Sequence, residues 1–279
     1  MSTIDLPRPA DLQVYNAPEV ASHYARLDYL TPCERLLIDR YVKAGMHVLD
    51  LGVGGGRTTP YLSMLAQHYV GVDYAAEMVK VCREKFPHLE FIEADAANMA
   101  MLPDGSFDVV FFSFNGLDVL SPDEKRRNCL SECHRLLRAG GTFIFSSHNP
   151  RALFVRPGWD PARVRAFSQQ LVGEHRLLYP LTVAAVTGAK AVLATLRAMG
   201  ATARRMFNRV PSRTFWRGEG YMLDSAHGSL ATHYWSPEKA VSELLQFRFR
   251  CLEVAGDDYP RQSRSSVTDW YYYVFSRES

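Results

Sequence analysis

The chain has 279 residues, 47% of them apolar, and a formal net charge of +2. This length and composition exclude a chain too small to bury a core of its own, and they predict one large or two small globular domains. Residues 1–16 contain no basic segment followed by an apolar stretch, so we expect no secretory signal. Five cysteines, an odd number without CxxC spacing, favour buried reduced thiols in a cytoplasmic protein: Cys33, Cys82, Cys129, Cys133 and Cys251.

Residues 1–45 form the first predicted unit, an N-terminal helical lid. Within it, residues 11–30 are polar and rich in aromatic side chains. Residues 31–34 (TPCE) are a capping box with proline at the first helical position, which predicts a helix that ends at Gly45. Two interpretations of the aromatic segment stay open: an arm that packs its tyrosines on the core, and a lid over a ligand site.

A glycine-rich turn follows the first predicted strand, within residues 46–59 (MHVLDLGVGGGRTT). Apolar residues up to Leu51 predict a buried strand, and Arg57 begins a helix. The turn between them has few side chains, so a ligand can approach its backbone and the positive end of the helix; its glycines are Gly52, Gly54, Gly55 and Gly56. This order of strand, glycine turn and helix is typical of the nucleotide-binding start of a doubly wound α/β sheet.

Two residues beside the turn discriminate between nucleotides. Counted from Gly52, a dinucleotide fingerprint would place its last small residue at Arg57. Asp50 stands two residues before Gly52, where a carboxylate would repel a pyrophosphate and attract a cofactor that carries an ammonium group. An ordinary tight turn explains the glycines equally well, so the rest of the chain must decide.

Further predicted strands follow in a regular β–α alternation. Asp73 ends the second strand, 23 positions after Asp50, near the separation of about 20 expected for an acid that binds a ribose. The alternative role for Asp73 is the N-cap of the next helix. The predicted strands after the first lie at residues 69–73, 89–94, 107–113 and 142–147.

The helix between the last two of these strands has predicted signals at both ends. Residues 121–124 (SPDE) are expected to cap its start, and Gly140 and Gly141 to stop it. Such an alternation predicts a mostly parallel sheet with helices on both faces.

Five stretches in this order and spacing resemble motifs of the class I S-adenosylmethionine-dependent methyltransferases: VLDLGVGGG, VGVD, EADA, FDVVFFSFNGLDVL and HRLLRAGGTFIFSSHN. The resemblance covers residues 46–149 and extends more loosely over 236–277. It implies an α/β fold with a doubly wound, mostly parallel seven-stranded sheet. The core would comprise residues 46–150 and 236–279, and residues 151–235 would form a basic, helical and aromatic cap insertion after the fifth strand.

The same resemblance implies S-adenosyl-L-methionine as the cofactor and gives roles to residues of the motifs. Asp50 would lie near the methionine amino group, Gly52 and Gly54 against the cofactor, and Asp73 at the ribose hydroxyls. A core position on its helix is the alternative for Met78. The remaining cofactor residues would be Tyr74 and Met78 beside the adenine, Asp95 and Ala96 at its amino group, and Ser113 at the sheet edge.

The predicted insertion carries most of the chain's basic charge. Residues 151–218 contain twelve lysines and arginines against two acids, a net charge of +10, so the rest of the chain carries −8. Residues 181–206 predict an amphipathic helix with a basic stripe. It has three interpretations: it covers the acidic remainder of the chain, faces an acidic substrate or acidic partner protein, or lies on a membrane surface. No motif indicates DNA, and a spanning helix is not expected.

Aromatic residues and histidines crowd the end of the insertion, between residues 216 and 235. They suit the wall of a small-molecule pocket, and the packing of one or two extra strands is the alternative. Residues expected to contact the acceptor are Tyr24, Asn115, His227 and His233.

The expected reaction is in-line methyl transfer to oxygen or nitrogen of a small, natural-product-like molecule. An oxygen acceptor would benefit from a general base, for which the candidates are His148, His227 and His233; His148, directly after the fifth strand, is the best placed. No spacing indicates a metal site. The alternatives are an enzyme of this fold with a non-methyl reaction, a nicotinamide oxidoreductase and a non-catalytic cofactor-binding protein. The oligomeric state stays open.

Overall fold

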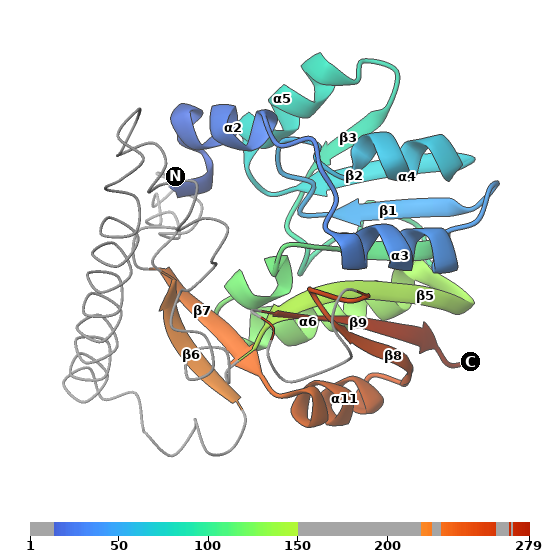
Figure 1. The fold of residues 1–279 in the computed structure, drawn as a ribbon. Helices are drawn as coiled ribbons and strands as arrows, with labels where there is room; N and C mark the ends of the chain where they lie inside the picture. The colour runs from blue at the N-terminus through green and yellow to red at the C-terminus, as the bar shows by residue number, and fades with distance from the viewer. Residues whose placement is uncertain (1–13, 150–218, 225–229, 261–267, 269) are drawn as a thin grey trace, which may run out of the picture. The chain divides into compact units, whose positions relative to one another are not determined.

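A computed structural model of the chain describes residues 14–149, 219–224, 230–260, 268 and 270–279 (Figure 1). Its helices and strands are α2 (Pro18–Ala25), α3 (Pro32–Tyr41), β1 (His47–Leu51), α4 (Thr59–Leu65), β2 (His68–Asp73), α5 (Ala76–Lys85), β3 (Glu90–Glu93), β4 (Phe107–Phe112), the 3-10 helix η1 (Gly116–Val119), α6 (Asp123–Leu136), β5 (Leu137–His148), β6 (Glu219–Asp224), β7 (Leu230–Trp235), α11 (Pro237–Gln246), β8 (Phe249–Gly256) and β9 (Trp270–Arg277).

The strands form a seven-stranded sheet in the order β3-β2-β1-β4-β5-β9-β8. Strands β1 to β5 pair in parallel, and β9 is antiparallel to both β5 and β8. Strand order reverses between β1 and β4, and at such a switch point the loops beyond the carboxyl ends leave a crevice for a ligand. The predicted doubly wound, mostly parallel sheet is confirmed.

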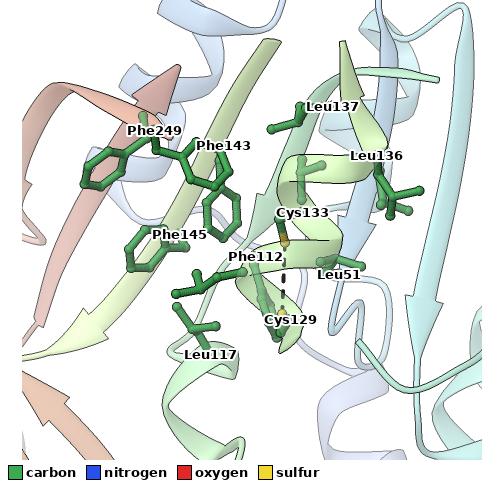
Figure 2. Close-up of a cluster of buried hydrophobic side chains, with 14 of the residues drawn as sticks. Leu51, Phe112, Leu117, Cys129, Cys133, Leu136, Leu137, Phe143, Phe145 and Phe249 are labelled. Carbon is green, nitrogen blue, oxygen red and sulfur yellow. Dashed lines mark hydrogen bonds between the residues drawn. The ribbon is translucent and has the colours of Figure 1, made fainter. Parts of the chain in front are cut away.

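Both faces of the sheet are apolar, as expected for parallel strands covered by helices on each side. Within β1, Val48 belongs to the cluster that includes α3, whereas Leu49 and Leu51 belong to the cluster that includes α6 and α11. Figure 2 shows part of the second cluster, where Phe112 and Phe145 lie near buried side chains of α6 and η1. Because neither face is left to solvent, the ligand sites lie at the carboxyl edge.

Helix boundaries confirm one predicted cap and correct another. The Thr31 hydroxyl accepts the Glu34 N–H at 3.2 Å, and the Glu34 carboxylate accepts the Thr31 N–H at 2.8 Å, so the capping box forms. The prediction for residues 121–124 was wrong, because Pro122 is the N-cap of α6 and makes no side-chain cap.

The glycine pair after α6 also takes another role than predicted. Helix α6 ends at Leu136, and β5 begins at the fully buried Leu137, which pairs with Phe107 of β4. Gly140 and Gly141 therefore lie within β5, where the pairing register shifts, and they do not terminate the helix. Burial of Leu137 and pairing with β4 outweigh the local glycine signal.

The described part of the insertion is a hairpin. Strands β6 and β7 pair antiparallel, with Glu219 opposite Trp235 at one end and Asp224 opposite Leu230 at the other. This hairpin belongs to the same compact unit as the sheet. The basic stretch 181–206 lies outside the described residues. Among the helices that the structure describes, none has the length and apolar character needed to cross a membrane.

Candidate active site

The glycine turn leaves β1 with a backbone that excludes side chains. Gly52 and Gly54 have φ of +59° and +54°, in the left-handed region. A Cβ on Gly52 would lie 2.6 Å from the Phe112 ring, and a Cβ on Gly55 would lie 2.4 Å from the backbone of Tyr24. The turn thus packs tightly against β4 and α2 and leaves its remaining surface open to a ligand.

A cavity opens beside this turn and collects most of the predicted cofactor residues. Tyr15 and Tyr24 of the N-terminal segment line it together with residues that follow β2, β3 and β4. Eight of the nine predicted residues contribute to its wall: Gly52, Gly54, Asp73, Tyr74, Met78, Asp95, Ala96 and Ser113. Met78 is 1% exposed and packs against α2, so it is both a core residue and a lining residue.

Asp73 connects the end of β2 to the glycine turn. Its Oδ2 accepts the Gly54 N–H at 2.8 Å, and its Oδ1 accepts the Ala75 N–H at 2.9 Å. Helix α5 begins at Ala76 with Ala75 as N-cap and no side-chain cap, so Asp73 is not its N-cap. Burial raises the pKa of Asp73 to about 6. Each oxygen keeps a lone pair with which it can accept a ligand hydroxyl.

Asp95 lies across the cavity at the end of β3. Its Oδ2 is 2.9 Å from Lys125 Nζ, and its Oδ1 accepts the Ala97 N–H at 3.0 Å. Lys125 also lies over the Tyr74 ring, 5.8 Å from its centroid. The carboxylate is therefore held in one orientation, with acceptor capacity left for an amino group.

Asp50 is the predicted cofactor residue that the cavity does not include. It is 2% exposed, and its Oδ2 accepts the hydroxyls of Thr58 at 2.6 Å and Tyr69 at 2.9 Å. Burial raises the pKa of Asp50 to about 7. The hydroxyls of Thr58 and Tyr69 thus hold this carboxylate within the protein, and its predicted contact with the methionine amino group stays a prediction.

Arg57 makes a buried network that the sequence did not predict. Its guanidinium donates to both carboxylate oxygens of Glu34, at 2.7 and 2.6 Å, and to the Ser113 hydroxyl at 3.2 Å. The Phe114 ring lies 3.8 Å from the guanidinium carbon. Burial alone would lower the pKa of Arg57, but the hydrogen bonds and charge of Glu34 outweigh it and raise that pKa. The pair ties α3 to the glycine turn and to the end of β4.

A second cavity adjoins the first and shares Tyr15, Tyr24, Phe114 and Val119 with it. Its volume of about 740 Å³ lies within the roughly 300–1,000 Å³ typical of small-molecule sites. Apart from its histidines and tyrosines, the described lining holds one ionisable side chain, Glu19. The lining residues are Val14, Tyr15, Glu19, Val20, His23, Tyr24, Leu27, Tyr29, Phe114, Asn115, Val119, His148 and Trp270. Tyr24, Asn115 and His148, all predicted from the sequence, thus meet in one cavity.

His148 is oriented by a buried carboxylate of η1. Its Nδ1 lies 2.8 Å from Asp118 Oδ2, and its backbone N–H donates to the same oxygen at 2.7 Å. The Ser147 hydroxyl donates to Asp118 Oδ1 at 2.7 Å. Asp118 is fully buried, and no local pattern in the sequence indicates its role, because its contact with His148 forms only when η1 packs against β5.

His233 takes a place other than the predicted one. It is fully buried on β7, with Nε2 3.4 Å from Glu219 Oε1 and Nδ1 4.0 Å from Asp118 Oδ1. The hydrogen bond with His233 holds the pKa of Glu219 at about 2. His233 is not among the described lining residues of the two cavities, and its contact with the acceptor stays a prediction. His227 lies outside the described residues.

The aromatic residues of β7 pack in the core. Trp235 lies 6.2 Å from the Phe145 ring and 5.1 Å from His233, centroid to centroid. For this strand, the structure supports the interpretation that these aromatic residues pack an extra hairpin rather than the interpretation that they form the wall of a pocket. Within the described ranges, no three His, Cys, Asp or Glu side chains gather as a metal site.

The donors and acceptors of the first cavity fit an adenosyl amino acid. Left-handed glycines bring bare backbone to its wall, and Asp73 and Asp95 present acceptors at two separate points. The sheet order and this site fit the fold and the cofactor site of class I S-adenosylmethionine-dependent methyltransferases.

Comparison with known proteins agrees. A family model described as a methyltransferase domain matches residues 48–141. A demethylmenaquinone methyltransferase from Clavibacter sepedonicus is 33% identical over 121 residues, which cover 42% of this chain and 47% of the relative. A ubiquinone biosynthesis O-methyltransferase from Aromatoleum aromaticum is 27% identical over 151 residues, 50% of this chain and 63% of the relative. The chain thus spans about half the length of the curated relatives it matches.

Solved structures show the same fold at low identity. The CcbJ methyltransferase from Streptomyces caelestis aligns with a TM-score of 0.59 and 16% identity, over 95% of this chain and 98% of that one. A 1,6-didemethyltoxoflavin-N1-methyltransferase from Burkholderia thailandensis, solved with 1,6-didemethyltoxoflavin and S-adenosylhomocysteine, aligns with a TM-score of 0.56 and 14% identity. The alignment covers 100% of this chain and 95% of that one. The methyltransferase fold therefore extends well beyond the residues of the family model.

Proposed function

We propose that this protein transfers a methyl group from S-adenosylmethionine to a small, uncharged aromatic acceptor. The observation that carries the proposal is the pair of adjoining cavities with common walls at Tyr15, Tyr24, Phe114 and Val119. One cavity carries the residues that fit the cofactor, and the other is apolar, of suitable volume and open to His148.

The lining of the second cavity supports an uncharged, flat acceptor. Tyrosine, phenylalanine and tryptophan side chains surround it, and aromatic walls favour stacking with an aromatic ring. No lysine or arginine is among its described lining residues. Relatives named for demethylmenaquinone and ubiquinone biosynthesis agree with such a substrate class.

Bound S-adenosylmethionine would supply a methyl group on a positively charged sulfur, which a nucleophile displaces in line. The protein's own task is then to position the cofactor and the acceptor and to exclude water. Asp73 would accept the ribose hydroxyls and Asp95 the adenine amino group, which together fix the cofactor at both ends of its nucleoside. Tyr24, which lines both cavities, would limit water at their junction. Such orientation contributes about 7–11 kcal/mol in well-aligned systems.

Two assays test the proposal. In calorimetry, S-adenosylmethionine and S-adenosylhomocysteine are expected to bind, whereas NAD and NADP are not, which separates a methyltransferase from a nicotinamide oxidoreductase. With hydroquinones and other small aromatic acceptors, release of S-adenosylhomocysteine is expected together with a methylated product. Cofactor consumption without that product would favour a non-methyl reaction, and binding without turnover of any acceptor would favour a non-catalytic role.

A further inference from the structure

We infer that His148, positioned by Asp118, is the general base that removes the proton of an acceptor hydroxyl, so that this protein methylates oxygen. The inference rests on the proposed function and deepens it, because it names the reacting atom of the acceptor and the group that prepares it.

Asp118 fixes the orientation of the His148 ring. Asp118 Oδ2 accepts both the backbone N–H of His148 and its ring Nδ1–H, at 2.7 and 2.8 Å. Two bonds from one residue to one oxygen restrict rotation of the ring. With the proton of the neutral imidazole on Nδ1, Nε2 carries the lone pair, and His148 lines the acceptor cavity.

The position of Asp118 depends on the loop that precedes η1. Phe114 and Asn115 have φ of 52° and 59°, two successive left-handed residues that are not glycine. Such conformations are strained in residues other than glycine and persist where the surroundings require them. Here the Asn115 N–H donates to the Ser146 hydroxyl at 2.8 Å, which docks the loop on β5 and places Asp118 beneath His148.

Asn115 lies on the acceptor side of the ring. Asn115 Nδ2 lies 3.4 Å from His148 Nε2, and Asn115 Oδ1 is buried without a hydrogen-bond partner among the described residues. Both residues line the same cavity. A hydroxyl placed between the two side chains would replace this long Nδ2–Nε2 contact: it would donate to His148 Nε2 and accept from Asn115 Nδ2, an arrangement that fits an alcohol or phenol.

Among the described residues, the titratable groups around His148 and Asp118 are acidic, imidazole and phenolic. Glu19 and His23 of α2 line the same cavity as His148, His233 of β7 lies 4.0 Å from Asp118, and Tyr273 of β9 interacts with the charge of Asp118. Asp118 is the acid in direct contact with His148, and its carboxylate stabilises the imidazolium that proton transfer would create.

The step balances as a single displacement. The hydroxyl oxygen forms a bond to the methyl carbon, while the carbon–sulfur bond breaks and leaves its electron pair on sulfur. The hydroxyl proton goes to His148 Nε2, and the imidazolium later releases it to water through the cavity. The products are a methyl ether and S-adenosylhomocysteine.

The test uses two phenols as probes, 4-methoxyphenol and the more acidic 4-nitrophenol, which is largely ionised at about pH 8. His148→Gln and Asp118→Asn are compared with His88→Gln, a change at an exposed histidine away from both cavities. We expect His148→Gln to lower kcat for 4-methoxyphenol by about 10²–10⁴-fold, and for 4-nitrophenol far less, because an ionised oxygen needs no base. Equal losses on both phenols would contradict a role as base.

A second readout needs no turnover. Long-range ¹⁵N NMR of the S-adenosylhomocysteine complex is expected to show the Nδ1–H tautomer of His148, and a shift toward Nε2–H in Asp118→Asn. An Nε2–H tautomer in the unaltered protein would overturn the inference. So would failure to methylate either phenol in a protein that binds S-adenosylmethionine and methylates an amine, a result that leaves the proposed function intact. Failure to bind the cofactor would instead refute the proposed function.

Discussion

The guanidinium of Arg57 and the carboxylate of Glu34 form a paired, two-bond contact in a site where their side chains are 8% and 0% exposed. Arg57 stands directly after the glycine turn, and Glu34 belongs to the first turn of α3. The contact therefore holds the cofactor turn against an element that lies outside the sheet.

Removal of one partner should be far more costly than removal of both. Glu34→Gln leaves the buried charge of Arg57 unbalanced, and we expect a loss of about 3–5 kcal/mol in the free energy of unfolding. The double change Glu34→Leu with Arg57→Met should lose less than the single one. Asp39→Asn, which breaks the exposed Arg35–Asp39 pair at 3.8 Å, serves as control and should cost at most about 1 kcal/mol. Urea denaturation measures all three, and similar losses for Glu34→Gln and the control would refute the role of burial.

Gly55→Ala tests the contact between the glycine turn and α2. Its Cβ would lie 2.4 Å from the Tyr24 backbone, which cannot move without displacing α2. We expect a loss of about 1–3 kcal/mol in stability and weaker cofactor binding, because Tyr24 lines both cavities. Gly140→Ala, where no atom lies within 4 Å of the new Cβ, should leave cofactor binding unchanged. Equal cofactor affinity in Gly55→Ala and the unaltered protein would show that α2 does not shape the site.

Asp73→Ala should weaken S-adenosylmethionine binding by about 1.5–3 kcal/mol, because charge-assisted hydrogen bonds to the ribose are lost. Calorimetry of the folded variant measures this difference. Asp104→Asn, a change at an acid with a 78% exposed side chain, is the matched control. Unchanged affinity in Asp73→Ala would remove this residue from the cofactor site.

Asp50 makes the stability of the fold depend on pH. Its pKa rises to about 7 in the folded protein, so the folded state retains a proton that the unfolded state releases near pH 4. The free energy of unfolding should therefore fall as pH rises from about 4 to 7, at about 1.4 kcal/mol per unit, and then level off. Asp73, with a pKa of about 6, acts in the same direction.

Asp50→Asn removes this titration and retains an oxygen that can accept from Thr58 and Tyr69. We expect the stability of the variant relative to the unaltered protein to increase by about 2–3 kcal/mol as the pH rises from about 5 to about 8. Thermal or urea unfolding at the two pH values measures the difference. A gain independent of pH would mean that Asp50 is ionised throughout the folded state.

Much of the fold and of the cofactor site was predictable, because both follow from local order along the chain. Apolar runs with glycine or acidic ends mark β1, β2 and β4, and parallel strands joined by helices bring their carboxyl ends to one edge. Asp73, Asp95 and Ser113 lie at or just after the carboxyl ends of β2, β3 and β4, and they therefore meet in one cavity.

The contacts that the sequence did not predict involve side chains whose partners come from distant segments. Asp50 has the expected position in the chain, but Thr58 and Tyr69 supply hydroxyls that hold it inside. His233 pairs with Glu219 across a hairpin that no local pattern announces. No residue near Asp118 in the sequence indicates its role either, since only the tertiary fold brings η1 into contact with His148.

The most direct test of the account is a crystal structure of the protein with S-adenosylhomocysteine. We expect the ribose hydroxyls within hydrogen-bond distance of Asp73, the adenine amino group at Asp95, and the sulfur directed toward the cavity that contains His148. A ligand bound elsewhere, or a glycine turn that takes up a dinucleotide and rejects S-adenosylhomocysteine, would contradict it.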